Sequence, residues 1–121
     1  SFLGVHEGPQ RISKLGGGVP MEPGMILSNE PGYYKEGAYG IRTENLVVVS
    51  DLKGSEGAER DMLGFETITL APIDWALIDP HLLTDSDREW LNTYHLRVRN
   101  SLSPLVDADV RKWLDDATKP I

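Results

Sequence analysis

The clearest pattern in the chain is an alternation of side chains along residues 40–50, which is typical of a β-strand. One face carries Ile41, Thr43, Asn45, Val47 and Val49, and the other carries Arg42, Glu44, Leu46 and Val48. Because Leu46 and Val48 are apolar, we interpret the second face as core-like. Arg42 and Glu44 on such a face need partners, since an unpaired buried charge is very costly.

The pattern leaves the partners of Arg42 and Glu44 open. An acid and a base two residues apart on one strand face often form a local ion pair with each other. Each could instead pair with another charged side chain or with a metal ion. Glu30 stands directly before a Pro-Gly pair and, taken alone, is typical of a solvated turn residue.

Shorter extended runs surround this strand. Pro23 and Gly24 fit the centre of a type II turn, in which Gly24 supplies a positive φ, and this turn leads into a strand at residues 25–30. Residues 33–39 are interpreted as the hairpin connection to the strand at 40–50. A polar loop at 51–61 then precedes a further strand at 63–71.

The period of the pattern changes after Pro72, from that of strands to that of helices. Thr84 is an expected helix N-cap, with acidic residues in the first turn. The apolar positions of two helices are Leu91, Tyr94, Val98 and Leu102 in the first and Val110, Trp113, Leu114 and Ala117 in the second. His95 falls on the packed face of the first helix and is interpreted as a structural histidine. The sequence therefore predicts an α+β fold, an antiparallel sheet followed by two C-terminal helices.

Charge and composition narrow the possible partners. The net charge of the 121 residues is −7, from 12 basic and 19 acidic side chains, and no basic patch is apparent. Nucleic acid and anionic membranes are therefore not expected partners. There is no cysteine, and no apolar run approaches the ~20 residues that a membrane span needs. We expect a cytoplasmic protein.

Several runs together resemble one family. The run Asn-Glu-Pro-Gly-Tyr-Tyr at residues 29–34 and the run Gly-Ile-Arg-Thr-Glu-Asn at 40–45 are similar to the two glutamate motifs of the creatinase/aminopeptidase P superfamily of "pita-bread" dinuclear metallopeptidases. Residues 1–10 resemble the histidine motif that precedes them. Residues 63–73 and 90–95 are similar to the C-terminal extension of the longer, three-domain Xaa-Pro aminopeptidases.

The resemblance implies a fold and an activity. Residues 1–71 would be the C-terminal part of the catalytic pita-bread domain, and residues 72–121 would be the helical C-terminal extension. The implied activity is metal-dependent release of the N-terminal residue from peptides with proline in second position. Two divalent metal ions would be required, with Mn²⁺ expected and Co²⁺ or Zn²⁺ possible, since oxygen-rich ligand sets suit such ions.

The resemblance also implies roles for five residues. Glu30 would bind one metal ion, and Glu44 would bridge both. Arg42 would have a catalytic role by pairing with a metal-ligand aspartate, and Tyr34 would join the same hydrogen-bond network and bind substrate. His6 would contact the substrate or the reacting oxygen and would not itself be a metal ligand.

The sequence departs from the family pattern by omission. The family site has two aspartates, one histidine and two glutamates as metal ligands, and the sequence offers only the glutamates. We therefore expect the C-terminal part of a larger aminopeptidase, inactive alone, whose partners are the upstream half of the catalytic domain, a peptide substrate and a second copy in a homodimer. Two alternatives stay open: a prolidase-type dipeptidase, and a metal-free pita-bread binding or scaffold module.

Overall fold

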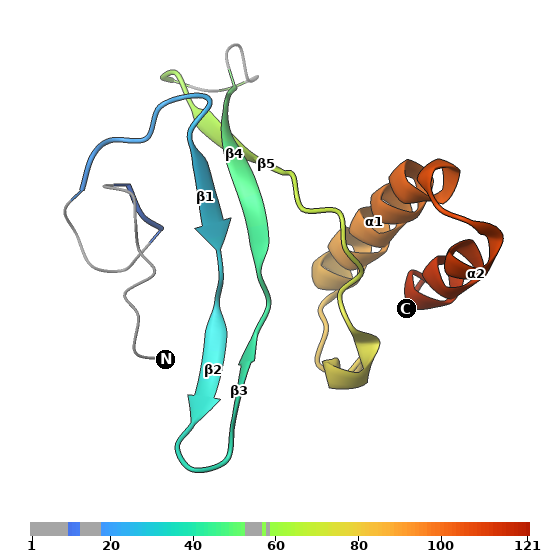
Figure 1. Cartoon of the computed structure of the whole chain (residues 1–121). Helices are drawn as coiled ribbons and strands as arrows, with labels where there is room; N and C mark the ends of the chain where they lie inside the picture. Colours follow the sequence, from blue (N-terminus) through green and yellow to red (C-terminus); the bar gives the residue numbers. More distant parts are fainter. Residues whose placement is uncertain (1–9, 13–17, 53–56, 58) are drawn as a thin grey trace. The chain divides into compact units, whose positions relative to one another are not determined.

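The computed structural model describes residues 10–12, 18–52, 57 and 59–121 of the chain. The chain forms two compact units, Ser1–Thr69 and Leu70–Ile121, and the first contains strands while the second contains helices (Figure 1). The strands are β1 (Ile26–Asn29), β2 (Gly32–Lys35), β3 (Tyr39–Arg42), β4 (Asn45–Asp51) and β5 (Leu63–Thr67).

The strands pair in two groups, all of them antiparallel. β4 lies between β1 and β5 in a three-stranded sheet, and β2 pairs with β3 in a hairpin that runs on from the ends of β1 and β4 (Figure 1). The expected strand at 40–50 is therefore interrupted between β3 and β4, where the Thr43 amide donates to the Pro31 carbonyl at 3.2 Å. Pro31 has no amide to continue the ladder, which accounts for the matching break between β1 and β2.

The interpretation of residues 33–39 as a connection is wrong. Residues up to Lys35 belong to β2 and the chain re-enters a strand at Tyr39, so only three residues form the turn. By contrast, the turn before β1 is confirmed. Gly24 has a φ of 90°, and its amide donates to the Val49 carbonyl at 2.8 Å, which starts the sheet where the sequence predicts it.

The core of the sheet lies on one face. Leu27, Val47 and Val49 are buried together, and Met21 and Met25 pack against them. The interpretation of the opposite face as core-like is wrong within this chain, because Leu46 on that face is 45% exposed. Both faces of this strand are apolar in sequence, and the methionines that precede β1 cover only one of them.

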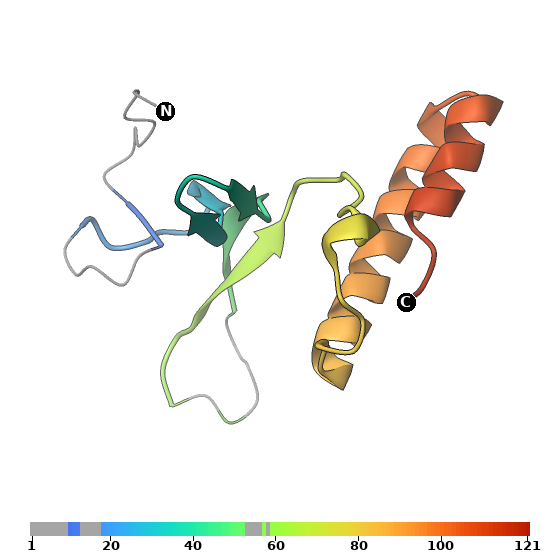
Figure 2. The ribbon, with the colours of Figure 1, turned by 90° about the horizontal axis from the view of Figure 1, so that it is seen from below.

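The helical unit contains α1 (Asp85–Leu102) and α2 (Ala108–Ala117), which lie side by side (Figure 2). Thr84 caps α1 as predicted: its hydroxyl accepts from the Asp87 amide, and the Asp87 side chain accepts from the Thr84 amide. Buried side chains join the two helices, namely Tyr94 and Val98 from α1 and Leu114 from α2. Two short 3₁₀ turns, Trp75–Leu77 and Ser103–Leu105, flank α1 in the chain.

The segment before α1 is held by side chains of the helical unit. The Tyr94 hydroxyl donates to the Ala71 carbonyl at 2.8 Å, and His95 Nε2 accepts from the Ile73 amide at 3.1 Å. Trp75 Nε1 donates to the Ala117 carbonyl at 2.9 Å, which ties the same segment to the end of α2. His95 is 1% exposed, in agreement with its prediction as a structural residue.

The other two tryptophans lie at the surface of this unit. Trp90 is 51% exposed and stacks on Tyr94 with ring centroids 5.4 Å apart, and Trp113 is 59% exposed. The sequence predicts a core position or a subunit contact for them. Their exposure in the chain is compatible with the second of these.

Candidate metal centre

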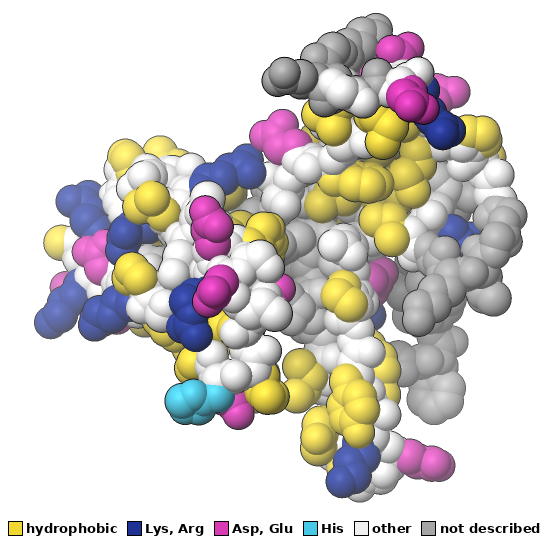
Figure 3. Space-filling model, turned by 180° about the vertical axis from the view of Figure 1, so that it is seen from behind, with side chains coloured by type: hydrophobic (Ala, Val, Ile, Leu, Met, Phe, Trp, Pro, Cys, Tyr) yellow, Lys and Arg dark blue, Asp and Glu magenta, His cyan; other side chains and the backbone are white. Residues whose placement is uncertain are grey.

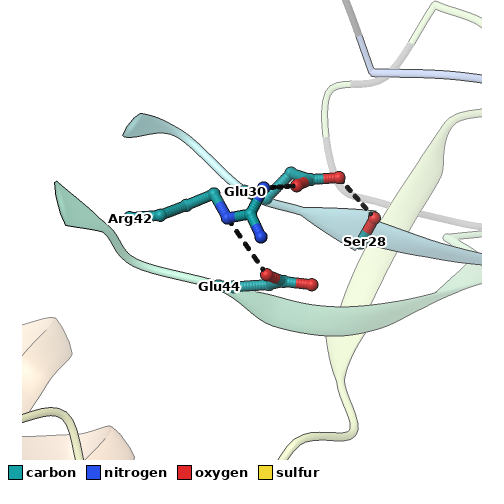
Figure 4. Close-up of polar contacts among 4 residues, drawn as sticks. All are labelled: Ser28, Glu30, Arg42 and Glu44. Atoms are coloured by element: carbon teal, nitrogen blue, oxygen red, sulfur yellow. Dashed lines mark hydrogen bonds and ion pairs between the residues drawn. The ribbon is translucent and has the colours of Figure 1, made fainter. Parts of the chain in front are cut away.

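The two glutamates of the motifs come together at the junction between the sheet and the hairpin. Glu30 stands between β1 and β2, and Glu44 stands between β3 and β4, so each occupies the break in its own run. Arg42 is the last residue of β3. The antiparallel register therefore brings both acidic side chains to the same level as the guanidinium (Figure 4).

Arg42 bridges the two carboxylates. Its Nη1 lies 2.7 Å from Glu30 Oε2, and its Nε lies 3.3 Å from Glu44 Oε2 (Figure 4). The local ion pair expected between Arg42 and Glu44 is thus present, and a second pair with Glu30 is added to it. One rigid guanidinium fork fixes both acids, which a flexible lysine ammonium would not do.

Ser28 is a member of the cluster that sequence reasoning missed. Its hydroxyl donates to Glu30 Oε1 at 2.9 Å, so the two oxygens of Glu30 have different partners, Ser28 and Arg42. A signal was available, because residues two apart on an extended run share a face and Ser28 precedes Glu30 by that spacing. Ser28 thereby orients the Glu30 carboxylate.

The cluster is open to solvent within this chain. The side chains of Arg42, Glu44 and Glu30 are 45%, 43% and 27% exposed. Ion pairs at this exposure contribute little to folding stability, typically about 0–1 kcal/mol each. These ion pairs therefore add little to the stability of the fold.

The remaining predicted site residues lie differently. Tyr34 is on β2 and is 66% exposed, with its ring against the backbone of the hairpin. His6 lies outside the described residues. Tyr34 therefore shares the hairpin with Arg42, whereas the prediction for His6 rests on the sequence alone.

The donor chemistry of the cluster fits a hard divalent cation in part. Two glutamate carboxylates are ligands that Mn²⁺ and similar ions accept. Across residues 10–12, 18–52, 57 and 59–121, no three His, Cys, Asp or Glu side chains gather closely enough to hold a metal ion. The described residues thus supply two donors and a guanidinium that aligns them.

The chain also matches known protein families. Residues 2–51 match metallopeptidase family M24, and residues 61–121 match the C-terminal region of peptidase M24. The chain belongs to metallopeptidase family M24. The first match contains both glutamates and Arg42, and the second contains β5 and both helices.

Similar proteins bear related names. The chain is 45% identical over 125 residues to a probable Xaa-Pro aminopeptidase P of Coprinopsis cinerea, with 99% of the chain covered and 20% of the relative. It is 46% identical over 124 residues to aminopeptidase P1 of Lotus japonicus, with 100% of the chain covered and 19% of the relative. The chain thus spans about a fifth of the length of these relatives.

A solved structure resembles this M24 chain in its fold. The crystal structure of X-prolyl aminopeptidase from Caenorhabditis elegans, a cytosolic enzyme with a di-nuclear active site, matches with a TM-score of 0.78 at 37% identity. The match covers 97% of this chain and 19% of that one. The predicted α+β fold, the C-terminal part of a pita-bread fold with two C-terminal helices, is therefore confirmed. None of the helices among the described residues has the length and apolar character to cross a membrane.

Proposed function

We propose that the whole protein is a metal-dependent aminopeptidase that releases the N-terminal residue from peptides with proline in second position. The observation that carries this proposal is the convergence of Glu30 and Glu44 on Arg42. It occurs within motifs of family M24, in a chain whose relatives are Xaa-Pro aminopeptidases. The C. elegans neighbour has a di-nuclear active site, which supports a requirement for two divalent metal ions.

Within this proposal each residue has a role. Glu30 would bind one cation and Glu44 would bridge two, while Arg42 holds both carboxylates and would pair with an acidic ligand from elsewhere in the protein. When bound, the two cations polarise the scissile carbonyl and activate a water molecule. Tyr34 would contact the substrate, and His6 would contact the substrate or the reacting oxygen.

Mn²⁺ is the metal that we propose, with Co²⁺ or Zn²⁺ as substitutes. Oxygen donors dominate the proposed ligand set, and such sets favour hard ions. The proposed location is the cytoplasm, in line with the cytosolic neighbour. Residues 1–71 are proposed to complete the catalytic domain together with its upstream half, and residues 72–121 to form the helical extension.

We further propose that the 121 residues alone have no peptidase activity. The described residues contain no group of three metal-ligating side chains, so the described part of the chain provides an incomplete donor set. The test is a peptidase assay on the purified chain with added Mn²⁺. Measurable, metal-dependent cleavage before proline would contradict this proposal.

The experiment for the proposed function uses the whole protein. Release of the first residue is measured on an Xaa-Pro tripeptide, on an Xaa-Pro dipeptide and on a matched tripeptide with alanine in second position, each with Mn²⁺ and with a chelator. We expect Mn²⁺-dependent release from the proline tripeptide only. Activity confined to the dipeptide would favour a prolidase. No release, and no metal retained after dialysis, would favour a metal-free scaffold module, against which the presence of both glutamates argues.

A further inference from the structure

The β2–β3 hairpin has two different faces. Pairing of Tyr34 with Gly40 and of Gly32 with Arg42 places these four residues on one face, because register partners point to the same side. The other face carries Tyr33, Tyr39 and Ile41, and its two tyrosine rings lie 6.1 Å apart. Hydrophobic side chains cover much of this projecting hairpin (Figure 3).

The Tyr34 ring lies lengthwise over two glycines. A Cβ added at Gly40 would lie 2.6 Å from Tyr34 Cδ1, and a Cβ added at Gly32 would lie 2.9 Å from Cε2 and 3.0 Å from the hydroxyl oxygen. The base of the ring thus rests on Gly40 and its tip on Gly32. Neither contact leaves room for a methyl group unless the ring moves.

Backbone conformation does not explain these two glycines. Of the glycines that the structure describes, those with positive φ are Gly18, Gly24, Gly37 and Gly57. Gly32 and Gly40 have ordinary strand conformations, in which glycine weakens a strand and commonly marks close approach of another group. The close group here is the ring of Tyr34.

We propose that Gly32 and Gly40 are positioning residues, which leave a bare strip of backbone on which the Tyr34 ring lies with its hydroxyl directed toward Arg42. Gly32 is the register partner of Arg42, and side chains of such partners start about 5 Å apart. The hydroxyl therefore lies over Gly32, on the face of the hairpin that also carries Arg42. The glycines act on this cluster only through Tyr34.

The consequence for catalysis rests on the function proposed above. If the Tyr34 hydroxyl contributes at the cluster, a methyl group at Gly40 should tilt the ring and lower kcat by up to about 10²-fold, a loss that a displacement near 1 Å can cause. Gly64→Ala is the matched control. Gly64 lies on β5, away from Tyr34, and a Cβ added there would lie 2.8 Å from Leu52 Cδ1.

The kinetic test is a double-mutant cycle in the whole protein. Gly40→Ala should lose about 10²-fold in kcat in the unsubstituted background and nothing further in a Tyr34→Ala background, since contacting residues are not additive. Gly64→Ala should keep the unsubstituted kcat. An equal loss from Gly40→Ala in both backgrounds, or a loss from Gly64→Ala as large, would overturn the proposal.

A second measurement does not depend on activity. In the 121-residue chain, proton NMR should show nuclear Overhauser contacts from the Tyr34 Hδ protons to Gly40 Hα and from the Hε protons to Gly32 Hα, with both Hα resonances shifted upfield by the ring. These shifts should vanish in Tyr34→Leu. Their absence from the unsubstituted chain would refute the positioning. If the whole protein has no peptidase activity, the proposed function fails, and this NMR pattern alone decides the proposal.

Discussion

Glu30 Oε2 and Arg42 Nη1 lie 2.7 Å apart, although β2 and most of β3 separate the two residues in the sequence. The hairpin register, which pairs Gly32 with Arg42, brings the guanidinium back to the level of Glu30. The distance between the two glutamate side chains therefore depends on the register of the hairpin.

Replacing Arg42 tests whether it aligns both acids. In the whole protein, Arg42→Gln should lower metal affinity or kcat/KM by about 10–100-fold, since residues that orient metal ligands commonly contribute this much. Bound metal is measured after dialysis, alongside the kinetics. Arg42→Lys should recover only part of the loss, because an ammonium does not hold two carboxylates in one fork.

Lys35→Ala provides the control for this experiment. Lys35 also carries a positive charge on the hairpin, but it lies on the face opposite to Arg42. Its removal should leave metal content and kinetics unchanged. A similar loss in Lys35→Ala would show that net charge, rather than alignment, explains the effect.

Glu44 and His6 should differ in the severity of their loss. In the whole protein, Glu44→Ala should abolish activity and release metal, because a bridging carboxylate holds both ions. His6→Ala should retain the metal and lose about 10²–10³-fold in rate, as expected for one group that stabilises the transition state. Equal residual activity with full metal content in both variants would contradict the assigned roles.

Much of the fold could be predicted because local signals were strong. The 3.6-residue pattern and Thr84 predicted α1, and Gly24 predicted the turn before β1. Strands β2 and β3 are exposed on both faces, so no apolar alternation marked Tyr33–Lys35 as a strand. The buried face of β4 was assigned wrongly because both of its faces carry apolar residues. Which face is buried depends on the methionines that pack against it, and these lie far away in the sequence.

The site could be predicted only where the partners are close in sequence. Arg42 and Glu44 are two residues apart, and their ion pair follows from strand geometry. The contact between Arg42 and Glu30 depends on the hairpin register, which in turn depends on the three-residue turn that the sequence interpretation placed wrongly. The positions of Gly32 and Gly40 beneath Tyr34 follow from the same register.

His95 makes the helical unit sensitive to acid. Burial holds the pKa of His95 below its ordinary value of 6.5. The unfolded chain therefore binds this proton at a higher pH than the folded chain. The contribution of His95 to the free energy of unfolding is therefore fully present above about pH 6.5. It falls as the pH drops toward the folded pKa, by at most about 1.4 kcal/mol per pH unit.

Guanidinium unfolding of the chain between pH 5 and 8 measures this effect. His95→Gln should remove the acid-side loss, although burying an amide there will lower stability overall. His81→Gln, which removes an exposed histidine, should keep the loss unchanged. A flat profile in the unsubstituted chain would refute the assignment.

The chain should associate with itself. In the described part of the sheet, β4 is central and pairs on both sides, so the outer strands are β1 and β5. Unpaired strand edges are templates for pairing with another chain, and Trp90 and Trp113 add exposed apolar surface. A symmetric dimer is the expected form. In sedimentation equilibrium, a single species near 13.4 kDa at every concentration would contradict this expectation.

The contacts that hold residues 71–75 before α1 affect the order in which the helical unit is expected to fold. Ala71 and Ile73 contact α1 residues 22–23 positions later in the chain, and Trp75 contacts Ala117, 42 positions later. Contacts between distant positions must first overcome the entropy of loop closure, whereas the contacts within a helix are local. We therefore expect α1 and α2 to associate first and the segment to dock last. A Trp75 fluorescence change that lags behind the recovery of helical circular dichroism would reveal this sequence, whereas simultaneous changes would indicate that the segment takes part in the nucleus.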